Sequence, residues 1–309
     1  MRWESDKNLR LKPERTAERG EYGSDRKLMI EGAVKKTEKI LKNAIKETDF
    51  VGEVYSKEEV DNDLNYVQKE EESFNEGIMD SEDKRTLEFS RIFEAIIYDQ
   101  GELANWFGEN GATIKSSRFD DIKNGVDLIV EFSGDEEETS HLALAVDVTF
   151  SDNIQKKLDN IKREIEHGKL TNIKYFQSDK LGFKGEKRDI PKTVVGADVK
   201  TLNKVMDLWV NEDEKRLAEH PIQFIILDEI MAQLEKFREY AQAMKKSNIV
   251  EKYDKAIAIM EKILAEKQDL REEVLKDDDS AIRNDRVYQA ITGYIDKVSA
   301  QKGPKTYKY

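Results

Sequence analysis

Two acidic residues stand where their carboxylates could share one divalent cation. Asp127 and Asp147 belong to the apolar, β-rich runs Val126–Phe132 and Leu142–Phe150, which flank the acidic turn SGDEEETS. This pattern predicts a β-hairpin with a loop longer than the tight two-residue type. A turn centred near Glu137 places Asp127 directly opposite Asp147, with the Cβ atoms roughly 5 Å apart.

Two carboxylates at this separation repel each other unless a cation lies between them or one of them binds a proton. Mg²⁺ suits such a pair, because it prefers one or two carboxylates together with water and phosphate oxygens. The alternative is a register slip of one residue, which would put the acids on opposite faces.

A third acid, Glu94, lies within the apolar stripe of a helix predicted over residues 82–107. A glutamate at such a position is usually a surface residue at the edge of the stripe. Because a hairpin with two acids follows this helix, a role for Glu94 in the same site as Asp127 and Asp147 is favoured.

The elements that must position these acids can be predicted from their patterns. The expected order is the helix 82–107, a strand over Ala112–Arg118, a DDIKNG turn, the hairpin, a helix with Ile154, Leu158, Ile161 and Ile165 on one face, and a strand over Asn172–Gln177. The last strand follows a helical connection, so it is expected to run parallel to the strand before it. The segment SDKLGFKGEKRDIPK is predicted to be a basic loop. A short strand over Thr193–Val195 and a helix over Asp198–Val210 follow.

The two ends of the chain are predicted to be mainly helical. Residues 1–27 are polar and expected to be flexible, and residues 28–47 form an amphipathic helix. Beyond Pro221, a helical hairpin broken near Ser247–Asn248 precedes a final helix, VYQAITGYIDKV. The predicted regions are a flexible or helical arm at 1–81, a core at 82–210 and a helical region at 211–309. The C-terminal helices offer a surface for a protein partner or for self-association.

Composition narrows the classes of function. Hydrophobic and charged residues each make up 38% of the chain, and the net charge is −13. This charge argues against a surface that coats nucleic acid broadly but permits a local basic groove. Basic residues outnumber acidic ones between Gln155 and Lys192. The absence of cysteine excludes disulfides, thiolate metal sites and a cysteine nucleophile.

The sequence signals of several other classes of protein and of site are absent. No apolar run approaches the roughly 20 residues of a membrane span, and residues 1–27 lack the apolar core of a secretory signal, so we expect a cytoplasmic protein with no membrane contact. The histidines, His141, His167 and His220, are too widely spaced in sequence to form a ligand pair such as HxxxH. Neither a G-x-x-x-x-G-K-[ST] phosphate loop nor a GxSxG nucleophile turn occurs.

The order of the elements and acids resembles the core of the PD-(D/E)XK nuclease superfamily, the restriction-endonuclease-like fold. Its motifs read GVD over Gly125–Asp127 and DVT over Asp147–Thr149, and the resemblance covers roughly residues 82–200. It implies an α/β (α+β) fold with an αβββαβ core and a mixed sheet, flanked by N-terminal and C-terminal helical segments. It also implies a metal-dependent nuclease that hydrolyses DNA.

The resemblance further implies roles for individual residues. Asp127, Asp147 and the backbone carbonyl of Val148 would bind Mg²⁺ or Mn²⁺, and Glu94 would match the helix acid that completes the metal site in many members. The bound ion would lower the pKa of a water molecule and neutralise charge on the phosphodiester.

Thr149 departs from the family pattern, which has lysine at this position. A threonine hydroxyl supplies no positive charge, so a lysine from a neighbouring element must replace it if the site is active. Lys156, Lys157 and Lys115 are the candidates. We expect Lys157, because it lies nearer the apolar stripe of its helix and therefore nearer the sheet.

Two other functions are open. Thr149 favours a catalytically inactive nuclease-fold module that binds nucleic acid or protein. The helical hairpin near residues 221–275 would favour a helical interaction protein with an incidental β-hairpin, if it proves to be the larger ordered part of the chain. The retention of all three acids favours the nuclease, because an inactive site has no reason to keep mutually repelling carboxylates together.

Overall fold

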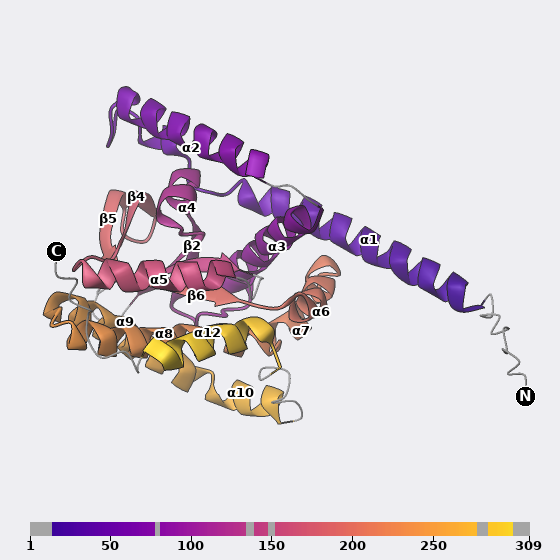
Figure 1. Cartoon of the computed structure of the whole chain (residues 1–309). Helices are drawn as coiled ribbons and strands as arrows, with labels where there is room; N and C mark the ends of the chain where they lie inside the picture. The colour runs from indigo at the N-terminus through magenta and orange to yellow at the C-terminus, as the bar shows by residue number, and fades with distance from the viewer. Residues whose placement is uncertain (1–13, 78–80, 134–138, 148–151, 277–283, 299–309) are drawn as a thin grey trace, which may run out of the picture.

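The computed structural model of the chain describes residues 14–77, 81–133, 139–147, 152–276 and 284–298, and within them it mixes helices with two small sheets (Figure 1). The helices are α1 (Glu14–Leu41), η1 (Glu47–Phe50, a 3-10 turn), α2 (Lys57–Gly77), α3 (Ser81–Leu103), α4 (Arg118–Asn124), α5 (Asp152–Glu166), α6 (Val199–Val210), α7 (Glu214–Ala218), α8 (Ile222–Ala243), α9 (Ser247–Glu266), α10 (Gln268–Leu275) and α12 (Arg286–Val298). The strands are β1 (Gly111–Lys115), β2 (Leu128–Ser133), β3 (Thr139–Asp147), β4 (Thr171–Ser178), β5 (Phe183–Ile190) and β6 (Lys192–Gly196).

The main sheet has the strand order β1-β2-β3-β6. β1 pairs antiparallel with β2, and β2 pairs antiparallel with β3, as expected for a meander that includes the predicted hairpin. β3 pairs parallel with β6, from Ala143 opposite Lys192 to Asp147 opposite Gly196. Parallel neighbours need a long crossover, which here includes α5. The hairpin strands are central, as predicted.

The prediction that Asn172–Gln177 is the parallel strand is wrong. These residues lie in β4, which pairs antiparallel with β5 in a separate two-stranded sheet. The parallel strand is instead β6, which includes the predicted Thr193–Val195. The segment expected to be a basic loop contains β5. Charged residues are uncommon in strands, and β5 has several of them, so the sequence pattern did not indicate a strand there.

The β4-β5 hairpin covers one face of the main sheet. Ile129 of the sheet packs there with Ile173, Phe176 and Ile190 of the hairpin. The opposite face, which includes Leu128, belongs to the main core with the helices. Burial on both faces explains why β2 reads as a nearly continuous apolar run.

The DDIKNG segment, predicted to be a turn, lies in the short helix α4. Ser117 caps its N-terminus by accepting a hydrogen bond from the Asp120 amide, and Gly125 ends it in the left-handed conformation, with φ at 61°. Asp120 also accepts hydrogen bonds from the backbone amides of Lys174 and Tyr175, which ties α4 to β4. A helix of seven residues is too short to show a clear apolar period, so the sequence pattern did not reveal it.

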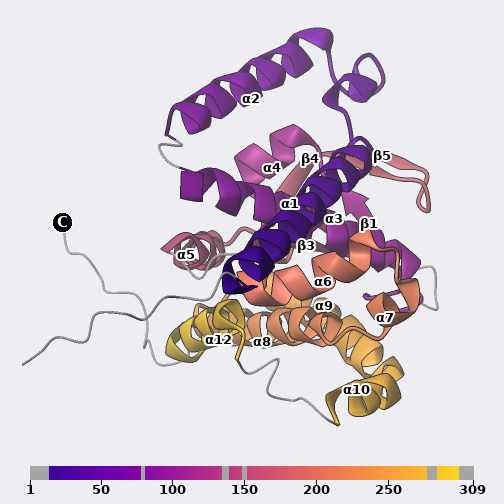
Figure 2. The ribbon, with the colours of Figure 1, turned by 90° about the vertical axis from the view of Figure 1, so that its right-hand side faces the viewer.

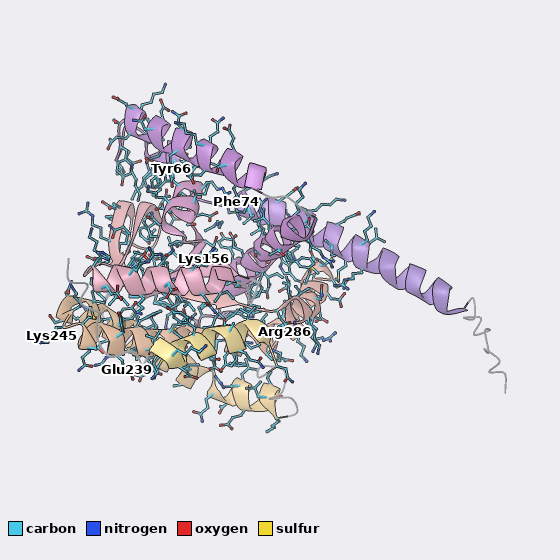
Figure 3. The ribbon with its side chains drawn as sticks, viewed as in Figure 1. Tyr66, Phe74, Lys156, Glu239, Lys245 and Arg286 are labelled. Carbon is cyan, nitrogen blue, oxygen red and sulfur yellow. The ribbon has the colours of Figure 1, made fainter. Side chains whose placement is uncertain are left out.

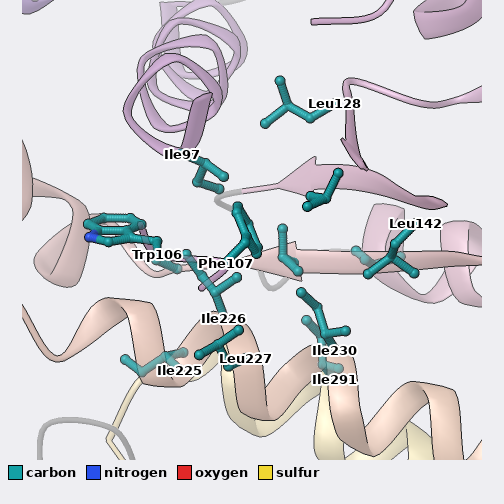
Figure 4. Close-up of a cluster of buried hydrophobic side chains, with 14 of the residues drawn as sticks. Ile97, Trp106, Phe107, Leu128, Leu142, Ile225, Ile226, Leu227, Ile230 and Ile291 are labelled. Carbon is teal, nitrogen blue, oxygen red and sulfur yellow. The ribbon is translucent and has the colours of Figure 1, made fainter. Parts of the chain in front are cut away.

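The main core joins all three predicted regions. Ala33 of α1 packs in the same cluster as residues of α3, the sheet, α5, α6, α8, α9 and α12. Figure 4 shows how this cluster brings Ile97 and Phe107 together with Leu142 of β3 and Ile226 of α8. The helical hairpin predicted beyond Pro221 is confirmed as α8 and α9, and both helices pack into this core.

Helix α8 also covers the free edge of β6. The Gln233 side chain accepts a hydrogen bond from the Val194 amide at 2.8 Å and donates one to the Val194 carbonyl at 2.7 Å. Glu229, one turn earlier, accepts a hydrogen bond from the Gly196 amide at 2.9 Å. These side chains replace the missing neighbouring strand and satisfy an edge that could otherwise pair with another chain.

Two perpendicular views show the outer arrangement of the helices. The acidic helix α2 lies above α4, while α8, α10 and α12 lie on the opposite side of the molecule (Figures 1 and 2). Helix α1 begins at Glu14, well before the expected start at residue 28. Among the described helices, none has the length and apolar character that crossing a membrane requires.

Candidate active site

The register of the hairpin differs from the prediction by two residues. Leu128 lies opposite Leu144, and Ser133 opposite Thr139. The ladder ends at Leu128, and extending its register by one step would place Ala145, not Asp147, opposite Asp127, so the prediction that Asp147 lies directly opposite Asp127 is wrong. The sequence pattern did not determine this register, because the alternation of the strands does not fix the length of the loop between them.

The chain leaves regular strand geometry at Asp127. Val126 and Ile129 pack in the same cluster against the β4-β5 hairpin although they are three residues apart, whereas Leu128 packs in the main core. Residues on one face of a regular strand are separated by two. The alternation of β2 therefore does not fix the direction of the Asp127 side chain.

Glu94 is buried on α3 and forms an ion pair with Lys115 of β1. The Lys115 Nζ lies 2.6 Å from the Glu94 carboxylate, and each side chain is only 8% exposed. The same Nζ donates a hydrogen bond of 2.8 Å to the backbone carbonyl of Asp127, and the Ser116 hydroxyl donates to that carbonyl at 3.0 Å. Lys115 thus links the helix acid to the start of β2.

Asp127 is surrounded by charges of both signs. Its removal from water, together with the negative charges of Asp121 and Glu94, raises the pKa of its carboxyl to about 8, while Lys157 and Lys115 act in the opposite direction. Lys157 and Glu94 come from α5 and α3, both of which pack in the main core. These two helices thus contribute charges of opposite sign near Asp127, and α4 contributes the negative charge of Asp121.

Lys115 is held in its charged form by this network. Burial alone would lower the pKa of Lys115, but the carboxylates of Glu94, Asp121 and Asp127 outweigh it and raise that pKa above its usual value. Lys115 therefore keeps its proton at neutral pH. Burial raises the pKa of Glu94, and the nearby Lys115 ammonium opposes that rise.

Asp121 is a site residue that the sequence pattern did not reveal. It lies on α4, forms an ion pair with Arg118, and contributes negative charge at Glu94, Lys115 and Asp127. Its position follows from α4, which was read as a turn. The acidic pair in the DDIKNG segment was the one signal that could have suggested it.

The three candidate lysines occupy different places. Lys115 is buried and linked to Glu94, and Lys157 is half-buried and acts on the charge of Asp127. Lys156 is exposed on α5 (Figure 3). The described side chains therefore associate two of the three lysines with Asp127.

The metal ligands expected from the resemblance lie only partly within the described residues. Val148 and Thr149 fall outside them, and for Asp147 the structure describes the backbone but not the side chain. Among the side chains that are described, no three histidine, aspartate or glutamate residues form a group able to hold a metal ion. The convergence of Asp127 with Asp147 remains a prediction.

The described residues nevertheless suit a hard divalent cation. Glu94 and Asp127 supply carboxylate oxygens, the donors that Mg²⁺ prefers. Removal from water, together with the negative charges of Asp121 and Glu94, raises the pKa of Asp127, and Lys115 and Lys157 only partly oppose this rise. An added cation beside Asp127 would relieve this repulsion and allow the carboxyl to ionise.

Comparisons with known proteins found no matching protein-family model, no matching curated protein and no matching solved structure.

Proposed function

We propose that this chain is a metal-dependent nuclease that hydrolyses DNA phosphodiester bonds with a PD-(D/E)XK-type core. The observation that carries the proposal is the association of three charged side chains with Asp127. Glu94 comes from α3, Lys115 from β1 and Lys157 from α5, and all three act on the charge of Asp127.

The topology supports the same proposal. Helix α3, strands β1, β2 and β3, helix α5 and the parallel strand β6 follow the αβββαβ order, with the short helix α4 inserted between β1 and β2 and the β4-β5 hairpin inserted before the last strand. Asp127 stands immediately before β2, and Asp147 is the last residue of β3. Both acids therefore come from adjacent central strands of one sheet.

In the proposed reaction the metal would be held by Asp127, Asp147 and the carbonyl of Val148, with Glu94 beside it. When bound, such an ion supplies an acidified water molecule and neutralises charge on the phosphodiester. Lys115 holds Glu94 in place and fixes the backbone carbonyl of Asp127. Lys157 contributes positive charge next to Asp127, which is the role that Thr149 cannot fill.

The second candidate is a catalytically inactive module of the same fold that binds nucleic acid. The residue that favours it is Thr149, because the family lysine is missing from its usual position. Under this alternative, Glu94 and Lys115 are a structural ion pair, and Asp127 keeps its proton at neutral pH.

A cleavage assay tests the proposal. Purified full-length protein is incubated with single-stranded and double-stranded DNA and with RNA, in Mg²⁺, in Mn²⁺ and in EDTA. The nuclease predicts metal-dependent cleavage of DNA that Asp147→Ala abolishes, since removing one carboxylate leaves the cation short of anionic oxygen. Glu239→Gln, an exposed substitution on α8, serves as the control that keeps wild-type activity. Absence of cleavage in every condition would favour the binding module.

A further inference from the structure

A basic cavity opens beside the acidic site. It has a volume of about 700 Å³ and is lined by the end of α4, by α5, by the start of β4 and by the start of β6. Cavities of this size lie within the range of roughly 300–1,000 Å³ that bound ligands occupy. Gly125 and Lys157 are among its lining residues, so the cavity reaches the neighbourhood of Asp127.

Positive charge dominates the lining. Its cationic residues are Lys123, Lys157, Arg163, Lys169 and Lys192, against one acid, Glu164. The local excess is therefore five minus one, or four positive charges, in a chain whose net charge is −13. A polyanion repelled by the rest of the surface would be drawn to this place, because field lines concentrate in a cleft lined by one sign of charge.

The cations divide into an inner and an outer group. Lys192 is buried, and its Nζ donates to the carbonyl of Asn124 at 2.9 Å and to Glu164 at 3.1 Å, which uses the single acid of the lining. Arg163 and Lys169 are exposed at the opening. Lys192 thus holds the walls together, whereas the outer cations face solvent.

The spacing along α5 fits a chain of phosphates better than a single small anion. Lys157 and Arg163 are six residues apart, which corresponds to about 9 Å along a helix axis. Lys169 follows shortly after the end of α5 and lines the same cavity. Cations that are spread along one cavity in this way match a strand whose charges repeat along its backbone.

We propose that this cavity binds the phosphates of the DNA strand next to the scissile bond. The identity of the ligand rests on the proposed function, whereas the binding of a polyanionic strand in the cavity does not require catalysis. Arg163 and Lys169 contact backbone phosphates without reading base sequence, as cations that contact phosphates generally do. The cavity thereby positions one side of the substrate relative to Asp127.

The experiment measures the binding of a fluorescein-labelled single-stranded oligodeoxynucleotide to the full chain by anisotropy, in EDTA, over a range of salt concentrations. We compare wild type with Arg163→Gln, Lys169→Gln and the double variant. The control is Lys215→Gln, an exposed lysine on α7, which lies on the other side of the molecule from α5 in both views. All of these side chains are exposed, so the variants are expected to fold, and thermal unfolding checks this.

Each removed phosphate contact is expected to weaken binding on the order of tenfold at about 50 mM salt, and to reduce the slope of log K against log salt by about 0.7. The double variant should therefore lose about 1.4 from the slope, while Lys215→Gln should match wild type. A purely structural role for these residues would leave the slope unchanged.

The outcomes separate this inference from the nuclease proposal. If wild type cleaves DNA but the double variant keeps the wild-type affinity and slope, the cavity inference is overturned and the nuclease stands. If the double variant loses affinity and slope while wild type cleaves nothing, the cavity inference stands and the nuclease falls. Failure of wild type to bind the oligonucleotide in EDTA would also overturn the inference.

Discussion

The Lys115 ammonium lies 2.6 Å from the Glu94 carboxylate, and both side chains are almost completely removed from water. The pair joins α3 to β1, and the additional hydrogen bond from Lys115 to the carbonyl of Asp127 extends it to β2. A buried charge without its partner is costly, because its lost hydration is not replaced. This relationship makes the site and the stability of the fold interdependent.

Lys115→Met should therefore destabilise the protein strongly. Removing one member of a buried ion pair typically costs about 3–5 kcal/mol, because the other charge stays buried. The double variant Glu94→Leu/Lys115→Met should recover most of that loss, since it removes both charges. Urea denaturation of the single and double variants measures the coupling. If the free-energy loss of the double variant equals the sum of the losses of the two single variants, Glu94 and Lys115 do not act as a pair.

Lys157→Gln should reduce DNA cleavage without a comparable loss of stability, because Lys157 is only half-buried. Removal of one charge-stabilising donor typically lowers the rate by on the order of 10²–10³. Lys156→Gln, one residue earlier and exposed, is the matched control and should retain the wild-type rate. If Lys156 or Lys115 proves to be the sensitive residue while folding is intact, our choice of lysine is wrong and the nuclease proposal survives.

Gln233→Leu should weaken the fold, because the amide and the carbonyl of Val194 lose their only described side-chain partner on α8. A buried donor or acceptor left without a hydrogen bond costs about 1–3 kcal/mol. Gln242→Leu changes an exposed glutamine on the same helix and should alter the free energy of unfolding little. Similar losses for the two variants would contradict a role for Gln233 in covering the β6 edge.

The sequence revealed those parts of the fold whose signals are local. The alternation in Leu142–Phe150 predicted β3, and the apolar spacings predicted α3, α5, α8 and α9, all of which the structure contains. The parallel strand was misplaced, since β4 and β6 are both short apolar runs and the choice between them depends on pairing partners. The polar strand β5, which removes β4 from the main sheet, carries little of the usual strand signal.

In the candidate site, too, the sequence indicated the residues that carry a local signal and did not indicate those whose positions depend on tertiary packing. Glu94 was recognised because it interrupts an apolar stripe, and Asp127 because it is an acid near the start of the β-rich run Val126–Phe132. The register between Asp127 and Asp147 was wrong by two residues, because it depended on the centre of a loop of unknown shape. Asp121 was missed because its position depends on a seven-residue helix. The close association of Lys115 with Glu94 depends on how α3 packs against β1, and no local sequence pattern specifies that packing.

The affinity for Mn²⁺ should increase with pH if Asp127 is a metal ligand. The pKa of Asp127 is raised to about 8, so below that pH the folded carboxyl binds a proton that the metal must displace. The apparent affinity should rise by up to about tenfold per pH unit between pH 6 and pH 8, and then level off. Titration calorimetry at several pH values measures this dependence. A constant affinity across the range would mean that the metal binds elsewhere or does not displace this proton.

The central claim is that Asp127 and Asp147 together hold the divalent ion that supports hydrolysis. It is tested most directly by Mn²⁺ titration calorimetry on wild type and on the Asp127→Asn/Asp147→Asn double variant, both checked for folding by circular dichroism. We predict one Mn²⁺ site in wild type and its loss in the folded double variant. Equal Mn²⁺ binding by both proteins, or none by either, would contradict the claim.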